Sequence, residues 1–458
     1  EKLYEIDQIE YPHVPTKLMG SFSLEAFGHR FKNYKLDFKD FSAYTQEMLT
    51  YCEADVGVTR SLYGLLCTQK YVPEASLYLE HSLARCVERQ IRSGFQFDVD
   101  GALTLVDELE SRKNQLNEEL QDAFPPVDEG KWFVPKVNNK AKGYVAGEKV
   151  WKEKLIAFNP ASRQQIYQRL NQKYGWMPQE KTEKGNPIVN DEVLEQLPFA
   201  EAKPLAEYML LSKRLGQIKD GSNAWLKLVQ PDGCIHGDLI TNGCITGRAS
   251  HRNPNMAQIP AVYSPYGKEC RSLFHPPDGW CLLGVDAKAL ELRCLAGYLA
   301  LYDDGEYGRI VCDDDLDIHT FNQEKFGVAT RDISKRLLYA VLYGAGHYKA
   351  GTIVDANETD PETIKANGRN AITSFMNGVP ALSELKGRLG LSLQRRGYLL
   401  GLDKRPLYCR SEFKTLNVLL QAAGAVLMKA TVVNLHENMK NFGLKYGVDS
   451  AIMSSRVG

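Results

Sequence analysis

The sequence predicts a mixed α/β (α+β) protein of several domains, and three observations lead to this class. Runs with apolar residues at helical spacing fill much of the chain to about residue 228. Short β-like runs and turns follow from Pro231 onward. Residues 280–285 then have the composition of a buried strand, and a helix is predicted directly after it over 287–301. At 458 residues and 43% hydrophobic, the chain can bury the cores of two to four domains.

The helical elements of the first half can be placed by their end signals. Helical spacing covers Leu24 to about Thr68. A second stretch runs from Leu77 to Ala123, and Ser93-Gly94 divides it into two helices because glycine favours a helix end. Ser162 can cap a further helix, and helix is expected to dominate from there to Leu228. Between these stretches, residues 125–157 are rich in lysine and turn formers, and we interpret them as a linker or inserted loop.

Composition excludes several classes of protein. Lys and Arg number 56 against 57 Asp and Glu, so any contact with nucleic acid must come from local clusters of charge. The ten cysteines form no CxxC pair, and we find no Cys/His ligand cluster, which favours a reducing compartment and argues against structural zinc. No signal segment and no run of 18 apolar residues is found, and we therefore expect a soluble cytoplasmic protein.

Asp286 stands where the predicted strand 280–285 meets the following helix. A carboxylate at a strand end is held by a rigid backbone and can point into a cleft, where it can bind Mg²⁺. Aspartate is also a favoured N-cap, so this segment alone leaves a capping role open. Glu291 lies five residues further on and, taken by itself, is an ordinary helix glutamate.

A second candidate site lies on the helix that Thr330 is expected to cap. Arg331, Lys335 and Tyr339 recur every four residues, so they share one face of that helix. Two cations one turn apart suit the charge of a triphosphate, and the tyrosine beyond them can contact a sugar or base. A solvated basic face remains the alternative, because surface lysine and arginine on helices are common.

These segments together resemble family A DNA polymerases, in particular the replicative polymerases of short-tailed phages. The string from Asp286 to Leu295 is similar to the first palm motif of that family. The pattern Arg-x3-Lys-x3-Tyr-x3-Tyr-Gly, which ends at Tyr343-Gly344, is similar to the fingers helix. Asp317-Ile318-His319-Thr320 resembles the segment that leads into it.

The resemblance implies a right-hand polymerase fold and a role for each matched residue. Asp286 would bind two Mg²⁺ ions, with Mn²⁺ as an alternative ion, and the backbone carbonyl of Ala287 would help. Glu291 and Tyr339 would close the space around the sugar and so favour deoxynucleotides. The nucleotide-binding set would be Arg331, Lys335, Tyr339, His319, Glu291 and Tyr343, with Lys335 also protonating the leaving pyrophosphate.

Contacts with primer-template DNA are implied for two other segments. Residues 245–274 resemble the palm segment that follows the minor groove, and 415–429 resemble the palm helix that faces the terminal base pair. Donors in the minor groove test pairing geometry rather than sequence. The matching DNA-binding residues are Arg248, His251, Gln258, Arg271, Asn417 and Gln421.

The resemblance also predicts the domain organisation. Residues 1–72 would be the C-terminal part of a 3′–5′ exonuclease domain, with Asp55 as its last metal ligand and Tyr51 as a water-positioning partner. The thumb would span 73–228, with the inserted loop near 125–157. The palm would comprise 229–298 and 417–458, its second part truncated, and the fingers 299–416.

Three departures from the family pattern shape the expectations. The other exonuclease motifs and the His-Asp-Glu motif are not found in this sequence, so we expect doubtful proofreading and poor catalysis unless the missing carboxylate is supplied. The loop 125–157 is shorter than the thumb insertion of phage relatives that recruit thioredoxin, which puts a borrowed processivity factor in doubt. The expected partners are primer-template DNA, dNTPs and a replicative helicase-primase, with no membrane. The alternatives are an inactive DNA-binding fragment, one half of a split polymerase, or a relative of the single-subunit RNA polymerases.

Overall fold

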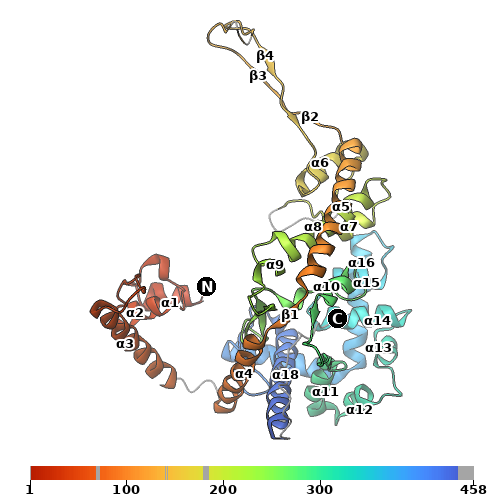
Figure 1. The fold of residues 1–458 in the computed structure, drawn as a ribbon. Helices are drawn as coiled ribbons and strands as arrows, with labels where there is room; N and C mark the ends of the chain where they lie inside the picture. Colours follow the sequence, from red (N-terminus) through yellow and green to blue (C-terminus); the bar gives the residue numbers. More distant parts are fainter. Residues whose placement is uncertain (1, 69–72, 140, 142, 179–184, 442–458) are drawn as a thin grey trace. The chain divides into compact units, whose positions relative to one another are not determined.

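The computed structural model describes all residues except 1, 69–72, 140, 142, 179–184 and 442–458. The chain divides into two compact units (Figure 1). The first unit combines residues 1–81 with 291–426, and the second combines 82–290 with 427–458. Each unit is described here by itself.

The N-terminal part of the first unit contains helices that are tied by a buried ion pair. The Arg30 guanidinium donates to both carboxylate oxygens of Asp7, each at 2.7 Å. The helical spacing from Leu24 to Thr68 proves to be two helices, because the chain leaves the first helix at Lys32 with φ of 55°. The helices of this part are α1 (Lys2–Glu10), α2 (Leu24–Phe31) and α3 (Gln46–Thr68), with a 3-10 turn at Thr16–Leu18.

The remainder of the first unit is a cluster of helices with one short hairpin. Phe326 and Phe375 are fully buried and stack with their ring centroids 4.0 Å apart, which joins α13 to α16. The hairpin pairs β10 (Leu399–Leu400) with β11 (Pro406–Leu407). The helices are α11 (Leu290–Asp303), α12 (Glu306–Cys312), α13 (Ile318–Phe326), α14 (Arg331–Leu342), α15 (His347–Val354), α16 (Pro361–Gly378), α17 (Pro380–Arg396) and the start of α18 (Thr415–Asn441), with a 3-10 turn at Glu412–Lys414.

Two glycines let the backbones of α15 and α16 approach closely. A Cβ built on Gly351 would lie 1.8 Å from the carbonyl oxygen of Ile364, and one on Gly368 would lie 1.9 Å from that of His347. Backbone atoms cannot move aside as a flexible side chain can. Glycine is therefore required where these two helices cross.

Replacing Gly351 by alanine is expected to reduce the free energy of unfolding by about 1–3 kcal/mol, because the two helices must separate to admit the methyl group. Gly387→Ala is the matched control, since a Cβ on this helical glycine meets nothing within 4 Å. That control should be neutral or stabilise the protein by up to about 1 kcal/mol. Urea unfolding of both variants measures the difference, and equal stabilities would contradict the close approach.

The second unit is built around long helices and a small antiparallel sheet. Ser162 caps α6 as expected, its hydroxyl accepting from the Gln165 amide at 3.3 Å. The break at Ser93-Gly94 is also confirmed, although a short strand, missed in the sequence, lies between the two helices. The helices are α4 (Glu74–Ser93), α5 (Val99–Ala123), α6 (Arg163–Tyr174), α7 (Asp191–Glu195), α8 (Ala202–Leu215), a π-helical turn (Gly216–Asp220), α9 (Trp225–Leu228) and α10 (Gly267–Ser272).

The sheet of the second unit has the strand order β6-β1-β9. The central strand is β1 (Phe95–Phe97), which pairs antiparallel with β6 (Cys234–Ile235) and with β9 (Phe274–His275). Phe97 packs against the rings of Trp225 and Phe274, at centroid distances of 6.3 and 5.2 Å, and those two rings also contact each other at 5.1 Å. A separate hairpin pairs β7 (Asp238–Ile240) with β8 (Ser250–Arg252), and a 3-10 turn follows at Met256–Gln258.

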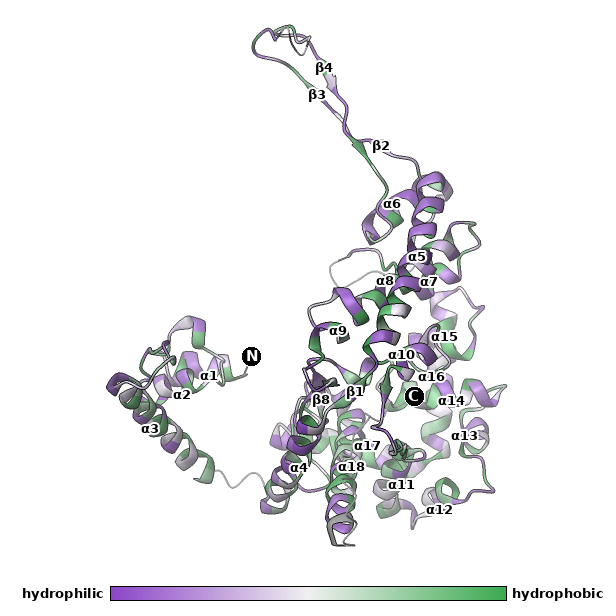
Figure 2. Ribbon diagram, in the orientation of Figure 1, coloured by the Kyte–Doolittle hydropathy of each residue, from purple (hydrophilic) through white to green (hydrophobic). Residues whose placement is uncertain are grey.

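The segment expected to be an inserted loop is largely a β-hairpin. β2 (Val127–Asp128) pairs with β5 (Leu155–Ile156), and β3 (Lys131–Phe133) pairs with β4 (Val150–Lys152). Trp132 faces Trp151 across the strands, with ring centroids 5.3 Å apart. The hairpin extends away from the helices of its own unit (Figure 1), and hydrophobic and hydrophilic stretches alternate along it (Figure 2). The sequence did not predict this pairing because the strands are only two or three residues long and lie among turn formers and lysines.

The prediction of a buried strand over 280–285 is wrong. These residues have no regular secondary structure, and Leu283 and Val285 are 87% and 83% exposed. A strand requires a neighbour to pair its N–H and C=O groups, and no strand among the described residues pairs with this run. The helix that follows begins at Leu290 rather than at Ala287 and ends at Asp303.

One helical segment among the described residues, Glu412–Asn438, is long and apolar enough by length and composition to cross a membrane. It includes most of α18, and half of its most apolar stretch is buried inside the protein. Length and composition alone would allow a span, but a core helix shows the same pattern.

Candidate active site

The sequence-predicted helix α14 forms with the expected cap and faces. The Thr330 hydroxyl accepts from the Ile333 amide at 3.2 Å and so begins the helix. Leu337 and Val341 are buried in the core. On the other face Arg331 and Lys335 are exposed and Tyr339 is half-buried. The helix therefore presents two cations and an aromatic ring, as the four-residue spacing predicted.

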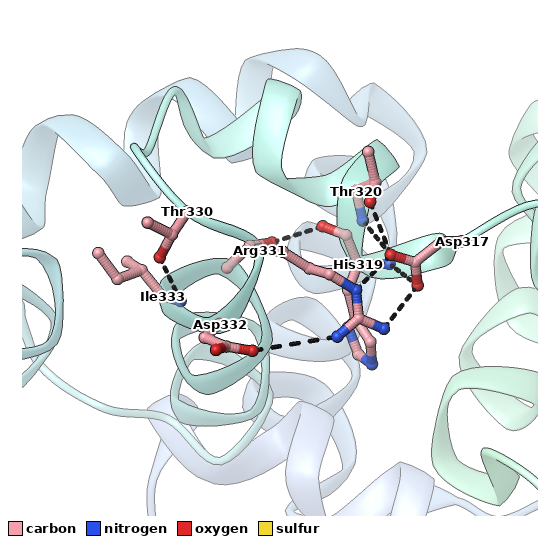
Figure 3. A network of polar contacts seen from close by, with 8 residues as sticks. Asp317, His319, Thr320, Thr330, Arg331, Asp332 and Ile333 are labelled. Carbon is pink, nitrogen blue, oxygen red and sulfur yellow. Dashed lines mark hydrogen bonds and ion pairs between the residues drawn. The ribbon is translucent and has the colours of Figure 1, made fainter.

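Asp317 holds the first of these cations (Figure 3). The Arg331 guanidinium donates from Nε to Asp317 Oδ2 at 2.5 Å and from Nη2 to Oδ1 at 2.9 Å. The same carboxylate caps α13 by accepting from the amides of His319 and Thr320. The Arg331 hydrogen bonds hold the pKa of Asp317 far below its usual range. Sequence analysis singled out Arg331 but not its carboxylate partner, although an aspartate directly before a helix is a capping signal.

His319 lies beside the same face of α14. Its backbone carbonyl accepts from the Ser334 hydroxyl at 3.0 Å, and its ring centroid is 6.4 Å from that of Tyr339. Burial, followed by the charge of Arg331, lowers the pKa of the imidazole. Its Nδ1 is buried and has no hydrogen-bond partner among the described residues. His319 is therefore better suited to form a hydrogen bond with a ligand than to supply a full positive charge.

Glu291 and Tyr343 are joined by a hydrogen bond. The Tyr343 hydroxyl donates to Glu291 Oε2 at 2.8 Å, linking α11 to the end of α14. Glu291 is only 6% exposed, and its Oε1 has no partner among the described residues. Tyr339 and Tyr343 lie side by side with ring centroids 6.3 Å apart. The interpretation of Glu291 as an ordinary surface glutamate is wrong, since a buried carboxylate needs a partner or a ligand.

The structure thus brings together six sequence-predicted residues within the first unit, on α11, α13 and α14. An orphaned carboxylate oxygen and an orphaned imidazole nitrogen lie in the same neighbourhood as two exposed cations. Such a set offers charge for a polyanion and a polar wall for a neighbouring group. Its members are Glu291, His319, Arg331, Lys335, Tyr339 and Tyr343.

Asp286 and Ala287 belong to the second unit and lie on the irregular segment before α11. The Asp286 side chain is exposed and Ala287 is half-buried. No group of three metal-ligand side chains gathers at Asp286 within the described part of the chain. A carboxylate oxygen and a backbone carbonyl are hard donors that fit Mg²⁺, so the ligand role of this pair stays a prediction.

Four further predicted residues lie on consecutive elements of the second unit. Arg248 lies in the turn of the β7–β8 hairpin, and His251 lies on β8, where burial lowers its pKa. Arg271 on α10 donates from Nε to the Pro260 carbonyl at 2.7 Å. Gln258 is exposed, and its backbone carbonyl accepts a hydrogen bond from the side-chain amide of Gln217 at 3.0 Å. Gln217 was not predicted as a site residue, because nothing in the sequence indicates this contact.

Asn417 and Gln421 lie one turn apart on α18. Both are half-buried, whereas their neighbours Leu416, Val418 and Leu420 are buried. The two amides therefore share the polar side of an otherwise apolar helix. Their contact with DNA stays a prediction.

Tyr51 and Asp55 lie one turn apart on α3, and Lys35 contacts both. Lys35 Nζ is 3.1 Å from Asp55 Oδ2 and 5.1 Å from the centroid of the Tyr51 ring. Hydrogen bonds to Tyr51 and then to Asp55 raise the pKa of the Lys35 ammonium. The other oxygen of Asp55 is buried without a partner among the described residues. A metal-ligand role for Asp55 stays a prediction, in which Lys35 would compete with the ion.

Comparisons with known proteins show which family this chain resembles. A sequence model of DNA polymerase family A matches residues 138–453. The DNA-directed DNA polymerase of Escherichia phage T7 is 33% identical over 95% of this chain and 75% of its own length, and that of Enterobacteria phage T3 matches equally. The polymerase domain of Pol1 from M. smegmatis, solved with DNA primer-template and dNTP, has a TM-score of 0.67 at 18% identity and covers 93% of this chain and 70% of its own. The last comparison shows a shared fold.

Proposed function

The chain belongs to DNA polymerase family A and is a DNA-directed DNA polymerase, and we propose that it extends a primer 3′-hydroxyl with dNTPs during phage DNA replication. The proposal is supported by the cluster on α11, α13 and α14, which combines two cations with a buried carboxylate. Family membership favours this function over an inactive DNA-binding fragment and over a single-subunit RNA polymerase. The predicted resemblance to phage polymerases is thereby confirmed.

Arg331, Lys335 and His319 would receive the triphosphate. Two exposed cations one helical turn apart match neighbouring phosphate groups, and the imidazole adds a hydrogen bond. Asp317 acts here as a positioning residue, because it fixes the plane of the Arg331 guanidinium through two hydrogen bonds. Tyr339 would lie against the sugar or base beyond the phosphates.

Lys335 would act as the general acid of the reaction. As the primer oxygen forms its bond to the α-phosphorus, the bond to the bridging oxygen of pyrophosphate breaks and negative charge develops there. An ammonium group on the same helix face as Arg331 can transfer a proton to that oxygen. The charge of Arg331 would stabilise the same pyrophosphate without proton transfer.

Family A polymerases use divalent metal ions, and we propose that this chain uses two Mg²⁺ ions. The carboxylate of Asp286 and the carbonyl of Ala287 would hold them, since both are oxygen donors of the kind Mg²⁺ prefers. When bound, such ions lower the pKa of the attacking hydroxyl and neutralise the leaving group. Asp286 is exposed, so it is open to solvent and to ions within its own unit.

Glu291 and Tyr339 would select deoxyribose by occupying the space beside C2′. The Tyr343 hydroxyl holds Glu291 in place, and burial prevents that carboxylate from swinging into solvent. A 2′-hydroxyl would therefore meet a fixed wall.

Replacing Glu291 by alanine is expected to reduce discrimination against ribonucleotides by about tenfold or more, because a pocket enlarged by a few atoms gains this much tolerance. Glu291→Gln is the matched control, since it retains the volume and can still accept from Tyr343. The ratio of kcat/KM for a dNTP and the matching NTP measures the effect. Unchanged selectivity in the alanine variant would remove Glu291 from the wall.

We further propose that primer-template DNA is bound by the second unit and by α18. Arg248, His251, Gln258 and Arg271 lie on consecutive elements that would follow the minor groove, where donors test pairing geometry. Asn417 and Gln421 would face the terminal base pair. Sequence preference is not expected, because most of these contacts would read duplex shape.

The proposal also includes a helicase-primase partner and a conditional exonuclease role. A replicative helicase-primase would supply single-stranded template in the host cytoplasm. Asp55 and Tyr51 would take part in an exonuclease site only when other acidic ligands join them, because one carboxylate is a weak metal site. The short hairpin 127–156 does not by itself indicate a processivity factor.

Primer extension on a primed template, with Mg²⁺ and all four dNTPs, tests the function. Extension that copies the template and stops when one dNTP is omitted is the expected result. A random-sequence duplex without a recessed primer end is the control for binding. Tight binding of primer-template without any extension would favour the inactive DNA-binding protein instead.

A further inference from the structure

A cluster of three potential metal ligands lies at the start of β6, on residues that the polymerase reaction does not use. Asp232 lies in the turn before β6, Cys234 lies on β6, and His236 follows the strand, and their side chains gather at one place. One ligand atom from each lies within 4.8 Å of the others. Among the residues that the structure describes, no other group of this kind occurs.

Two contacts orient the ring of His236 in this cluster. Its Nδ1 is 2.6 Å from the Ile91 carbonyl, and a carbonyl can only accept, so Nδ1 carries the proton. In the neutral ring, the lone pair of Nε2 then faces Asp232 Oδ2 at 2.9 Å. This distance is that of a hydrogen bond, and a metal ion bound by both atoms would replace that hydrogen bond. An imidazole that donates its other N–H to a backbone carbonyl is the usual arrangement of a metal-ligating histidine.

Gly94 has no side chain, and two side chains of the cluster occupy the space that a Cβ at this position would fill. It follows α4 with φ of 66°, and a Cβ there would lie 2.9 Å from His236 Cε1 and 3.0 Å from the Cβ of Cys234. The turn after α4 therefore packs directly against two of the three side chains. A residue with a side chain at this position would displace them.

We propose that Asp232, Cys234 and His236 bind a divalent transition metal of the Zn²⁺ class, with water completing a tetrahedron. Thiolate and imidazole donors select Zn²⁺ or Co²⁺ over the Mg²⁺ that polymerisation requires. On binding, the Cys234 thiol releases its proton to solvent and its sulfur bonds to the metal, with no change of oxidation state. The ion would join the end of α4, through His236 and Ile91, to the edge of the β6-β1-β9 sheet.

This site lies on the second unit and is independent of the nucleotide-binding residues. Asp232 is about half-exposed and His236 is about three-quarters buried, so one side of the ion would remain open to water. Because the cluster braces the sheet rather than the reacting atoms, its loss should change stability and metal content before it changes the chemistry of extension. From the sequence, we expected neither a CxxC pair nor a Cys/His ligand cluster, and a metal ion at Asp232, Cys234 and His236 would run against that expectation.

Titration of the metal-free full-length chain with Co²⁺, in the presence of excess Mg²⁺, tests the proposal. Thiolate ligation gives a near-ultraviolet charge-transfer band, and we expect it to saturate at one ion per chain. Cys234→Ser should abolish the band, and Asp232→Asn should weaken binding at least tenfold. Cys244→Ser is the matched control, because Cys244 is an exposed thiol on the neighbouring hairpin outside the cluster.

Thermal unfolding gives a second measurement that does not depend on the charge-transfer band. Zn²⁺ that binds the native chain should raise its Tm, and this increase should vanish in Cys234→Ser but not in Cys244→Ser. Circular dichroism without metal establishes that the variants are folded. A Co²⁺ band that survives Cys234→Ser, or no binding by the folded parent chain, would overturn the proposal and leave His236 as a hydrogen-bonded partner of Asp232.

Discussion

Replacing Asp286 by alanine is expected to lower the rate of primer extension by at least about a thousandfold while leaving DNA binding intact. The substitution removes the one carboxylate that the proposed mechanism assigns to both metal ions. Loss of several kcal/mol of charge stabilisation in the transition state corresponds to a factor of this size. Single-turnover extension with saturating primer-template measures the rate, and fluorescence anisotropy of labelled DNA measures binding.

Asp278→Ala is the control for this prediction, because Asp278 is another exposed aspartate close by in the sequence. It should extend primers at the parental rate. Since Asp286 is exposed, its loss should not reduce the stability of the fold. An alanine variant that keeps more than a tenth of the parental rate would remove Asp286 from the catalytic centre.

Replacing Lys335 by alanine is expected to slow nucleotide addition by about a hundredfold or more. The change removes both a positive charge near the triphosphate and the proposed proton donor, and general acid catalysis alone contributes about 10²–10⁴-fold. Lys335→Arg should recover nucleotide affinity but only part of the rate, because guanidinium holds its proton too tightly to give it up. Rapid-quench measurement of the rate and of apparent dNTP affinity separates the two effects.

Arg336→Ala is the matched control, since Arg336 is an exposed cation on the same helix but one residue away from the shared face. Its loss should change dNTP affinity by less than about threefold after correction for ionic strength. Equal losses in Lys335→Ala and Arg336→Ala would indicate a general field of positive charge rather than a proton donor.

Periodicity predicted the helices well because their signals are local. The cap at Thr330, the buried positions Leu337 and Val341, and the break at Ser93-Gly94 all follow from residues within one or two turns. The face of α14 that carries Arg331, Lys335 and Tyr339 could be predicted for the same reason. Its spacing of four residues requires no knowledge of the remainder of the fold.

Features that depend on distant partners could not be predicted. Whether residues 280–285 form a strand depends on a neighbouring strand and not on their own apolar composition. The burial of Glu291 and its bond to Tyr343, 52 residues away, depend on how α11 and α14 pack. The contact that orients the His236 ring could not be predicted either, because its partner is the carbonyl of Ile91, 145 residues earlier.

The Asp317–Arg331 pair gives the phosphate site a counter-ion of its own. Before nucleotide arrives, the guanidinium already has a carboxylate partner, so an incoming anion exchanges with that partner instead of meeting a bare cation. A small singly charged anion gains little from such an exchange. A triphosphate that also reached Lys335 would bring enough charge to make the exchange favourable. The proposed phosphate site would therefore discriminate against small salt anions, and this selectivity would arise from competition within the protein rather than from the shape of a pocket.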